Sequence, residues 1–435
     1  MKIRLLSLLL ISLFWLPAAQ AENLMQVYEL AIQNDAQFRA ARATRDSALE
    51  SRPQAVAQLL PNLSMSGSAN RIDSKVVNSP TGSNSTLYNS NSLTISLSMP
   101  VYRRELWVQL DQADDQIAQA EAVFAAAEQD LIVRTAQAYF DNLSAEESLE
   151  FANAETAAIG RQLEQAKQRF DVGLIAITAV HEAQAAYDQS RADLIQAEND
   201  LDNAREVLFE ITKSKTNRLA TLDKNLVLSK PVPENIEQWG SKALDQNLSI
   251  KAAEKATAIA RSNVKVKQSG HLPSLDLVGS HARNRYKDSL SSDTNNSTIG
   301  LQLTVPLFAG GSVNSQTRQA RYELEASQEN LDKERRSVIR QVRDAYRGVL
   351  ASISSVKALK ASTVSTRSAL EATEAGYEVG TRTIVDVLNS QRDLYRSLKN
   401  YANVRYNYIM SGLRLKQAAG TVSEQDLKQI TAWLR

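Results

Sequence analysis

Apolar residues recur along two long parts of the chain at alternating spacings of four and three. The first part carries this pattern from Leu106 to Leu131 and again from Val180 to Ile211. Shifted by 207 residues, the pattern returns from Val313 to Val338 and from Val387 to Ala418. Heptad spacing of this kind places one apolar seam along a helix and packs it against a neighbouring helix. The sequence therefore predicts four helices arranged as two long antiparallel coiled-coil hairpins.

The predicted helices are too long for a compact domain. Residues 103–170 would form one helix of 68 residues, which at 1.5 Å per residue extends about 100 Å. Ordinary helical core is the commoner meaning of a heptad stripe, but repetition over several heptads in four helices favours a packed multi-helix wall. The hairpins are expected to turn near 172–176 and near 379–382, at the two Val-Gly pairs.

Four segments between the helices alternate apolar and small polar residues. Leu93, Ile95, Leu97 and Met99, for example, are separated by Thr and Ser. Period-two alternation predicts strands with one apolar and one polar face. The expected strands are at about 62–70, 93–101, 274–283 and 298–306, and each pair encloses an expected polar loop, at 72–92 and at 287–298.

The first 21 residues form a secretory signal peptide by their pattern. Lys2 and Arg4 precede an apolar run from Leu5 to Leu16, and Ala19-Gln20-Ala21 supplies small residues at the cleavage site. The apolar run is too short to span a membrane, which takes about 20 apolar residues. We therefore expect an exported mature chain that begins at Glu22.

Export changes the interpretation of the four strands. A half-buried strand of a water-soluble sheet remains an alternative, but runs of this length joined by long polar loops are typical of membrane strands. Four strands cannot close a barrel, because the smallest known barrels have about 8. An oligomer in which each subunit gives four strands is therefore predicted.

Proline positions and short motifs divide the chain into two similar halves. No proline lies within 102–230 or within 307–435, and Phe170-Asp171-Val172-Gly173 recurs as Tyr377-Glu378-Val379-Gly380. These matches predict a two-fold internal repeat. The expected divisions are a first repeat at 22–230, a second repeat at 231–420 and a short C-terminal helix at 421–435. Each repeat is expected to consist of a helix, a strand pair and a long helical hairpin, in that order.

Composition excludes several kinds of chemistry. The 435 residues include Gly 15 and Pro 9, which is about half the usual share and fits a mainly helical chain. Cys 0 excludes disulfides, thiolate metal sites and a cysteine nucleophile. Lys+Arg 50 against Asp+Glu 49 gives no basic excess for nucleic acid. With His 3, no metal centre and no cofactor are expected.

Two other classes of function compete with a membrane channel. An enzyme is disfavoured, because the chain has no Gly-x-Ser-x-Gly, phosphate-binding loop or His-Glu-x-x-His motif, and no catalytic residue is assigned. A purely structural periplasmic coiled coil or adhesin leaves the four alternating strands unexplained. Extraction separates the alternatives, since a channel stays with the outer membrane in high salt and requires detergent.

Several segments together resemble the TolC family of outer-membrane efflux and type I secretion channels. They are Glu22–Tyr28, Val172–Thr178, Gly270–Leu277 and Tyr377–Leu388. The resemblance implies a homotrimer in the outer membrane of a Gram-negative bacterium. Its 12-stranded transmembrane β-barrel would continue as an α-barrel tunnel through the periplasm. The inner helices would close the tunnel at its periplasmic end and would untwist to open it.

The resemblance also implies partners and cargo. Such a duct passively conducts drugs, small toxic compounds or proteins, contacts outer-membrane lipid and binds no nucleic acid. A periplasmic membrane-fusion adaptor joins it to an inner-membrane pump of the resistance-nodulation-division (RND), major-facilitator (MFS) or ABC class. The hairpin tips would contact the adaptor, although their glycines have a sufficient role in turning the chain. The tip residues are Val172, Gly173, Leu174, Val379, Gly380 and Thr381.

The family's gate can be carried over onto individual residues. The latch that holds the inner coils closed would consist of Tyr377, Arg382, Glu374, Gln162 and Thr178, and the constriction would lie at Asp386 and Asn389. Two positions depart from the family pattern, because Ala179 and Asn389 stand where aspartates are expected. Without the resemblance, an Asp or Arg near a helix start is usually solvated surface. Three-fold symmetry would instead gather three copies of Asp386 at one axis.

Overall fold

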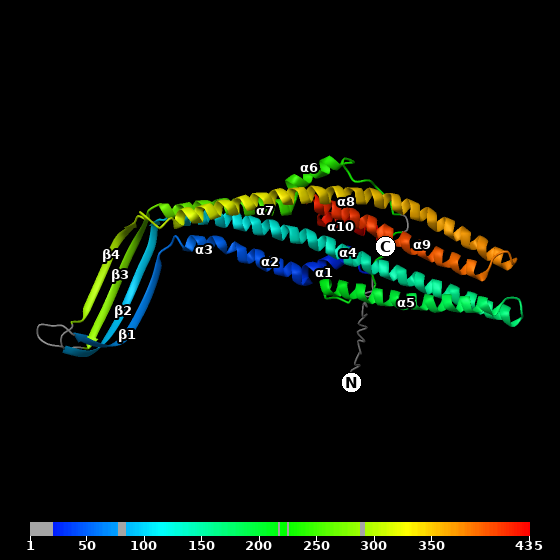
Figure 1. The fold of residues 1–435 in the computed structure, drawn as a ribbon, viewed down its shortest axis with the longest axis horizontal. Coiled ribbons are helices and arrows are strands. Elements are labelled where there is room, and N and C mark those ends of the chain that lie inside the picture. The colour runs from blue at the N-terminus through cyan, green and yellow to red at the C-terminus, as the bar shows by residue number, and fades with distance from the viewer. Residues whose placement is uncertain (1–20, 77–83, 216–217, 224–225, 288–291) are drawn as a thin grey trace, which may run out of the picture.

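The computed structural model describes residues 21–76, 84–215, 218–223, 226–287 and 292–435. Residues 1–20 of the expected signal peptide lie outside this range. The molecule is elongated, with a four-stranded sheet at one end and two helical tips at the other (Figure 1). Among the described residues, no helix combines the length and the apolar content that crossing a membrane requires.

Four long helices form the two predicted hairpins. In the first, α4 (Arg104–Asp171) has 68 residues and α5 (Ile177–Thr212) has 36. In the second, α8 (Ser312–Glu378) has 67 residues and α9 (Ile384–Ala418) has 35. Every seam position predicted by the heptads is buried or half-buried. The hairpin contacts of α4 with α5 and of α8 with α9 lie toward the tips, as between Thr156 and Ser190, and α9 also lies along α4. Nearer the sheet the seams of α4 and α8 instead pack against the shorter helices, chiefly α7, so the prediction that they join the two arms of each hairpin is wrong there.

Shorter helices precede each strand pair and follow α9. The helix expected before the first pair is divided into α1 (Leu24–Asn34), α2 (Ala36–Leu49) and α3 (Ser51–Ala57). The helix before the second pair is divided into α6 (Ile236–Gln246) and α7 (Leu248–Gln268), followed by a 3₁₀ turn at Ser269–His271. The C-terminal helix, α10 (Glu424–Thr431), is capped by Ser423 and Asp426.

The sheet contains four antiparallel strands in the order β1-β2-β3-β4. They are β1 (Asn62–Val76), β2 (Asn84–Tyr102), β3 (Ser274–Lys287) and β4 (Thr294–Thr304). β1 and β2 come from the first half of the chain, and β3 and β4 come from the second. Pairing of β2 with β3 joins the two strand pairs into one sheet. In the described chain, β1 and β4 are the edges of the sheet, and neither has a partner on its outer side.

The prediction of long loops at 72–92 and 287–298 is wrong for most of the described residues. Residues 72–76, 84–92 and 294–298 belong to strands, and the β1–β2 ladder runs without a break from Asn62↔Ser98 to Val76↔Asn84. Lys287 likewise ends β3, residues 292–293 lie outside the strands as expected, and residues 77–83 and 288–291 lie outside the described part of the chain. Ladder hydrogen bonds join backbone groups and need no apolar side chain. The alternation of apolar and polar residues disappears where both faces of the hairpin are polar. The sequence pattern therefore predicts strands that are too short. At the other end β4 stops at Thr304, short of the expected residue 306.

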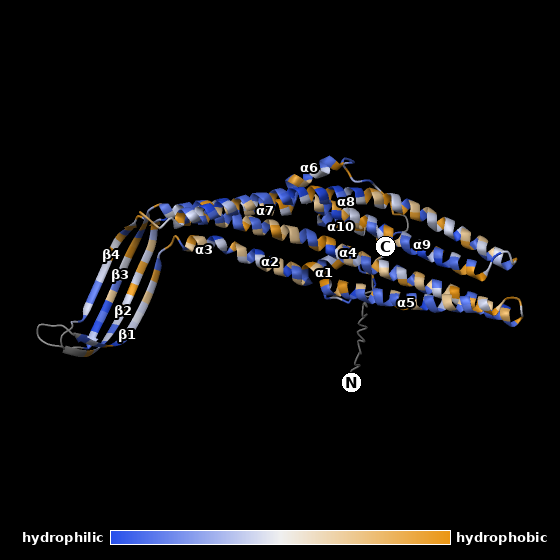
Figure 2. Cartoon of the chain, viewed as in Figure 1, coloured by the Kyte–Doolittle hydropathy of each residue, from blue (hydrophilic) through white to orange (hydrophobic). Residues whose placement is uncertain are grey.

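Strand register gives the sheet one apolar and one polar face near the helices. Residues directly opposite in an antiparallel ladder lie on the same face, and Leu97 lies opposite both Leu63 and Gly279. The strands are correspondingly more apolar near the helices and more hydrophilic toward their far ends (Figure 2). We call the apolar set the apolar band. Its members are Leu63, Met65, Leu93, Ile95, Leu97, Met99, Leu275, Leu277, Ile299, Leu301 and Leu303.

An ion pair lies where the sheet meets the helices. Arg103, directly before α4, donates from Nε and Nη2 to the two carboxylate oxygens of Asp276 on β3, both at 2.8 Å. Asp276 lies opposite Pro100, next to a register shift between Pro100 and Tyr102. The two-point contact fixes the orientation of the planar guanidinium. It therefore joins the start of α4 to a strand from the other half of the chain.

The main core lies midway along the molecule. There α1, α4, α9 and α10 meet residues 218–223, which belong to the link between the two halves. Leu24, Leu131, Tyr139 and Leu427 are fully buried there. The hydroxyl of Tyr139 donates to the carbonyl of Ala220 at 2.8 Å. Burial raises the pKa of this phenol, so the hydroxyl keeps its proton and its donor role.

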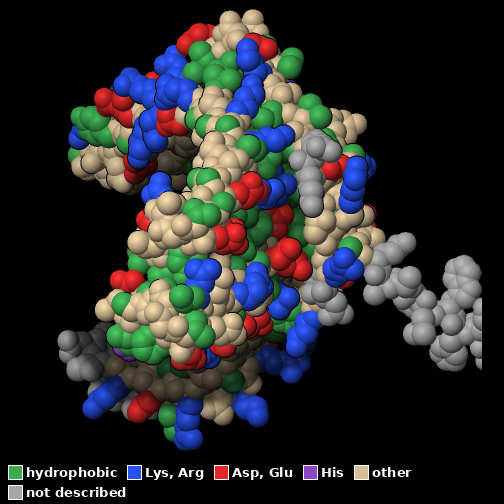
Figure 3. All heavy atoms as spheres, turned by 90° about the vertical axis from the view of Figure 1, so that its right-hand side faces the viewer, with side chains coloured by type: hydrophobic (Ala, Val, Ile, Leu, Met, Phe, Trp, Pro, Cys, Tyr) green, Lys and Arg blue, Asp and Glu red, His purple; other side chains and the backbone are tan. Residues whose placement is uncertain are grey.

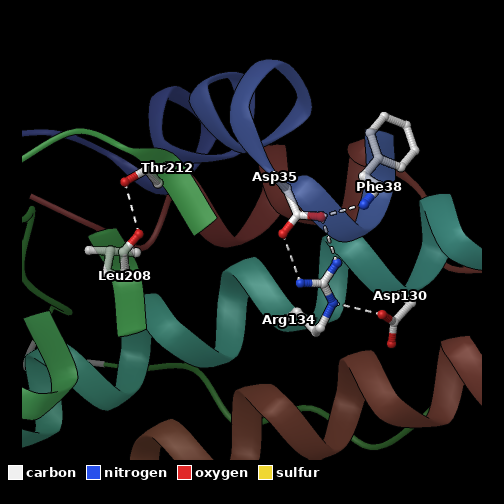
Figure 4. A network of polar contacts seen from close by, with 6 residues as sticks. All are labelled: Asp35, Phe38, Asp130, Arg134, Leu208 and Thr212. Carbon is white, nitrogen blue, oxygen red and sulfur yellow. Dashed lines mark hydrogen bonds and ion pairs between the residues drawn. The ribbon is translucent and has the colours of Figure 1, made fainter. Parts of the chain in front are cut away.

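A charged network fixes the break between α1 and α2 against α4 (Figure 4). Asp35 caps α2 by accepting the backbone N–H of Phe38 at 2.6 Å. Its two oxygens also accept from Nη1 and Nη2 of Arg134, each at 3.0 Å, while Nε of Arg134 donates to Asp130 at 2.7 Å. Burial acts to raise the pKa of Asp35, but the hydrogen bonds from Arg134 and Phe38 outweigh it and lower the pKa below its usual value.

Replacing Asp35 should destabilise the protein in a pH-dependent way. Asp35→Asn removes the charge from a largely buried pair and should cost about 3 kcal/mol, and Asp35→Ala also loses the helix cap, worth about 1 kcal/mol more. A lowered folded-state pKa contributes stability that is present above the unfolded value, about 3.9, and is lost as the pH falls through the folded pKa. Melting temperatures in detergent should therefore converge below about pH 4. Asp46→Asn, an exposed change on the same helix, is the control. A difference in melting temperature between the Asp35→Asn variant and the wild type that stayed the same at every pH would contradict this role of the Asp35 charge.

Candidate functional site

Both hairpin tips are built by the same backbone motif. Gly173 and Gly380 have φ of +75° and +78°, a left-handed conformation that side chains rarely adopt. The N–H of Leu174 donates to the carbonyl of Arg169 at 2.8 Å, and the N–H of Thr381 donates to the carbonyl of Gly376 at 2.8 Å. Each hydrogen bond joins residues five apart, which is typical of a Schellman motif at a helix C-terminus. The glycines are therefore required by the turn itself.

The tips expose apolar side chains to solvent. Val172, Leu174 and Val379 are 70%, 73% and 75% exposed. Figure 3 looks at the molecule from this end, and hydrophobic side chains are visible on the face that it shows. Large apolar side chains with this exposure at the tip of each hairpin are available to a partner protein. The sequence-predicted tip residues are thus available for contact.

Just behind the tips, a second apolar cluster joins the two hairpins. We call it the tip cluster, and Ala179 packs against its edge. The cluster is separate from the main core and much smaller, so contact between the hairpins at this end depends on few side chains. Its buried members are Ile159, Leu163, Ala166, Ala183, Ala186, Tyr377, Ile384, Val387 and Leu388.

Tyr377 is the predicted latch residue that the tip cluster contains. Its side chain is 8% exposed, and the guanidinium of Arg169 lies over its ring at 4.5 Å from the centroid. Within the described part of the chain, the Tyr377 hydroxyl has no hydrogen-bond partner. Tyr377 is therefore held by apolar packing and a cation–π contact. Arg169 is not among the residues predicted from the sequence. Its place in the last turn of α4 favours a cation, but the sequence does not reveal that it lies over the Tyr377 ring.

The other predicted latch residues do not form a hydrogen-bonded set in this structure. The side chain of Arg382 lies against Gly376, because a Cβ added at Gly376 would be only 2.8 Å from Cγ of Arg382. Thr178 is exposed, and Oε1 of Gln162 is buried without a partner among the described residues. Glu374 accepts a long hydrogen bond from Gln391 at 3.4 Å. Within one chain, contact at this level is therefore apolar rather than ionic.

Asp386 has a local role that the sequence interpretation overlooked. Its Oδ2 accepts the backbone N–H and the hydroxyl of Thr383, both at 2.9 Å, and the Asp386 N–H donates back to the Thr383 hydroxyl at 3.2 Å. This capping box begins α9. The Thr383 hydrogen bonds hold the pKa of Asp386 below its usual value. Asn389, the other predicted constriction residue, is exposed one turn further on.

Long helical hairpins beside a four-stranded sheet define a class of outer-membrane channel. The crystal structure of the Campylobacter jejuni CmeC outer membrane channel shares the fold, with a TM-score of 0.80 at 18% identity over 96% of this chain and 91% of that one. The profile of the outer membrane efflux protein family matches residues 27–212 and 239–421. The chain belongs to this family.

Two relatives indicate what members of the family do. Outer membrane protein TolC of Vibrio cholerae is 43% identical over 425 residues, covering 96% of this chain and 95% of the relative. The proteases secretion protein PrtF of Dickeya chrysanthemi is 29% identical over 430 residues, covering 96% and 92%. The chain is accordingly an outer-membrane exit duct for efflux and type I secretion.

Proposed function

We propose that three copies of the chain assemble into one duct. The open edges β1 and β4 carry this proposal, because unpaired backbone groups facing hydrocarbon cost several kcal/mol each. Pairing β4 of one copy with β1 of the next closes a 12-stranded barrel without an edge. The apolar band would then face lipid and the Ser- and Thr-rich face would line the pore. The long helices would continue as an α-barrel through the periplasm, and the similar element order of the two halves reflects an internal duplication.

The trimer makes a direct prediction about mass. Because the strands lack edge partners until the barrel closes, the protein in mild detergent should have three times the mass of one chain by native mass spectrometry. A stable monomer or dimer of the unmodified chain would refute the assembly.

Proline on the β1 edge tests how the copies pair. Successive N–H groups of a strand point to opposite sides, so one of two neighbouring residues, Ser66 or Gly67, directs its N–H outward. Proline lacks this donor. In one of the two variants Ser66→Pro and Gly67→Pro, the lost N–H is therefore the one that would bond to β4 of the next copy, and that variant should give a lower yield of trimer while the β1–β2 ladder keeps its hydrogen bonds. Ser66→Ala and Gly67→Ala keep the N–H and are the matched controls. Trimer yields that stay at the wild-type level in both proline variants would count against pairing through β1.

We further infer that the tips bind a periplasmic adaptor, which connects the duct to an inner-membrane RND, MFS or ABC pump. The exposed side chains of Val172, Leu174 and Val379 support this role, because each lies at the far end from the sheet. PrtF is named for protease secretion. Proteins, together with drugs and small toxic compounds, are therefore the proposed cargo.

The tip cluster is proposed to hold the periplasmic end closed. Opening requires α8 and α9 to move away from α4 and α5, which exposes Tyr377 and its apolar neighbours. The gate is then a balance between two populations, and removing closed-state contacts shifts it toward the open form. Ala179 offers no hydrogen-bond acceptor at its side chain, so closure depends on packing where an acid would give an ionic latch.

Tyr377 variants test this gate. Tyr377→Ala combined with Arg382→Ala should raise single-channel conductance in planar bilayers, but by less than loss of a charge-paired latch would. Tyr377→Phe should conduct like the wild type, because the described chain offers the hydroxyl no partner and the ring is retained. Equal conductance in the alanine double variant and the wild type would place the latch elsewhere, for example at Gln162 and Glu374.

The narrowest point is proposed to lie at Asp386, with Asn389 beside it. Three carboxylates near one axis would attract cations, and their mutual repulsion would raise the pKa of the ring. The Thr383 cap acts in the opposite direction within each chain. Titration of the ring would therefore belong to three coupled groups rather than to one residue.

Selectivity measurements test the ring while preserving the helix cap. Asp386→Asn keeps an oxygen that can accept from Thr383, and it should abolish weak cation selectivity and block by trivalent cations. Thr383→Ala keeps the Asp386 charge but removes both hydrogen bonds of the Thr383 hydroxyl, so selectivity should remain. If selectivity and block both persist in Asp386→Asn, the constriction lies at another level of the tunnel.

A further inference from the structure

Beyond the apolar band, the same face of the sheet changes from apolar to cationic. On β3, the exposed residues Arg283, Arg285 and Lys287 alternate with the half-buried Ala282, Asn284 and Tyr286. Arg283 lies opposite Leu93, the last member of the apolar band along β2, and Lys287 lies opposite Asn89. The three cations therefore share a face with the apolar band and continue it away from the helices.

Strand β1 adds to this cationic face. Arg71 is exposed and lies opposite Asn89, so one row across three strands reads Arg71, Asn89, Lys287. Adjacent strands are about 4.8 Å apart, which puts the two cations about 10 Å from each other. Lys75 lies further along the same face, with Asp73 between it and Arg71. We call Arg71, Lys75, Arg283, Arg285 and Lys287 the cationic band, and Lys and Arg side chains project at the lower margin of Figure 3, where this end of the sheet lies.

The charges are sorted by face rather than spread over a solvated hairpin. At the level of the cationic band, the opposite face carries neutral side chains, among them Asn70, Ser90, Asn284 and Tyr286. A hairpin that merely needed solubility would gain it from charges on either face. Concentration on the face of the apolar band indicates a ligand on that side.

Depth in the membrane identifies that ligand, and this step rests on the proposed barrel. From Met99 to Leu93, the apolar band extends about 20 Å along β2 at about 3.3 Å per residue. At the tilt of about 40° that barrel strands have, this is about 15 Å of height, which lies within the apolar belt of about 25 Å. Arg285 and Lys287 follow Arg283 by about 7 and 13 Å along the strand. This places them among headgroups, on the side of the membrane away from the helices.

We propose that the cationic band binds phosphate groups of the lipid headgroups in the outer leaflet. Guanidinium groups match phosphate with two parallel hydrogen bonds. The aliphatic stems of Arg and Lys can lie along apolar surface while their charged ends reach the phosphates. An anionic protein outside the cell would need no continuity with the apolar band, and this favours lipid.

Lipid binding to the full-length protein in neutral detergent tests the proposal. The probe is lipid A with two phosphate groups, titrated by native mass spectrometry against the wild type and Arg283→Gln/Arg285→Gln/Lys287→Gln. Loss of three cations should weaken binding by about tenfold or more. Arg318→Gln/Arg321→Gln/Lys333→Gln removes three exposed cations from α8 and should bind like the wild type. Dephosphorylated lipid A should bind weakly to all three proteins, and inorganic phosphate should not displace lipid A.

Two outcomes overturn the proposal. One is equal affinity of the triple variant and the wild type for lipid A, and the other is equal binding of phosphorylated and dephosphorylated lipid. Conductance and mass separate this result from the proposed duct, because the triple variant should remain a conducting trimer. A wild type that neither trimerises nor conducts would count against the duct itself. If the triple variant does not fold, Arg285→Gln and Arg285→Lys give the comparison with the charge removed and retained.

Discussion

Pairing between β2 and β3 is the interaction on which the rest of the structure depends. These strands come from different halves of the chain, and their register runs from Asn89↔Lys287 to Pro100↔Asp276 before the shift at Pro100 and Tyr102. It decides which side chains share a face, leaves β1 and β4 as the edges, and brings Arg103 to Asp276. Because α4 begins directly after β2, the same pairing also sets where the first long helix leaves the sheet.

Stability is distributed unevenly along the helices. The main core combines side chains from most of the helices with the link between the halves, whereas the tip cluster joins the two hairpins through a few apolar residues. Regions with few buried contacts open at lower free energy than the core. A helix can therefore remain intact at its centre while its end moves. Packing in the main core does not by itself hold the two tips together.

Sequence patterns predict the parts of this fold that depend on periodic burial. Heptads predicted the long helices and which of their faces are buried, and Val-Gly pairs predicted the turns, because these signals are local. They did not predict that α7 covers the seams of α4 and α8 near the sheet. The predicted strand ends were wrong, since backbone pairing continues through residues such as Ile72 and Asn91 where alternation has faded. Arg169 over Tyr377 could not be predicted, because the two residues are remote in sequence and meet through tertiary packing. Thr383 and Asp386, by contrast, form a recognisable capping pattern three residues apart.

The construction of the tips has a consequence for how the protein can evolve. Each turn is closed by backbone hydrogen bonds and by one glycine in a left-handed conformation, so the side chains of Val172, Leu174 and Val379 contribute little to the fold. Substitutions at these positions alter the surface at small cost in stability. A lineage can thus exchange one binding partner for another by changing a few residues, while the glycines and the helices behind them remain as they are.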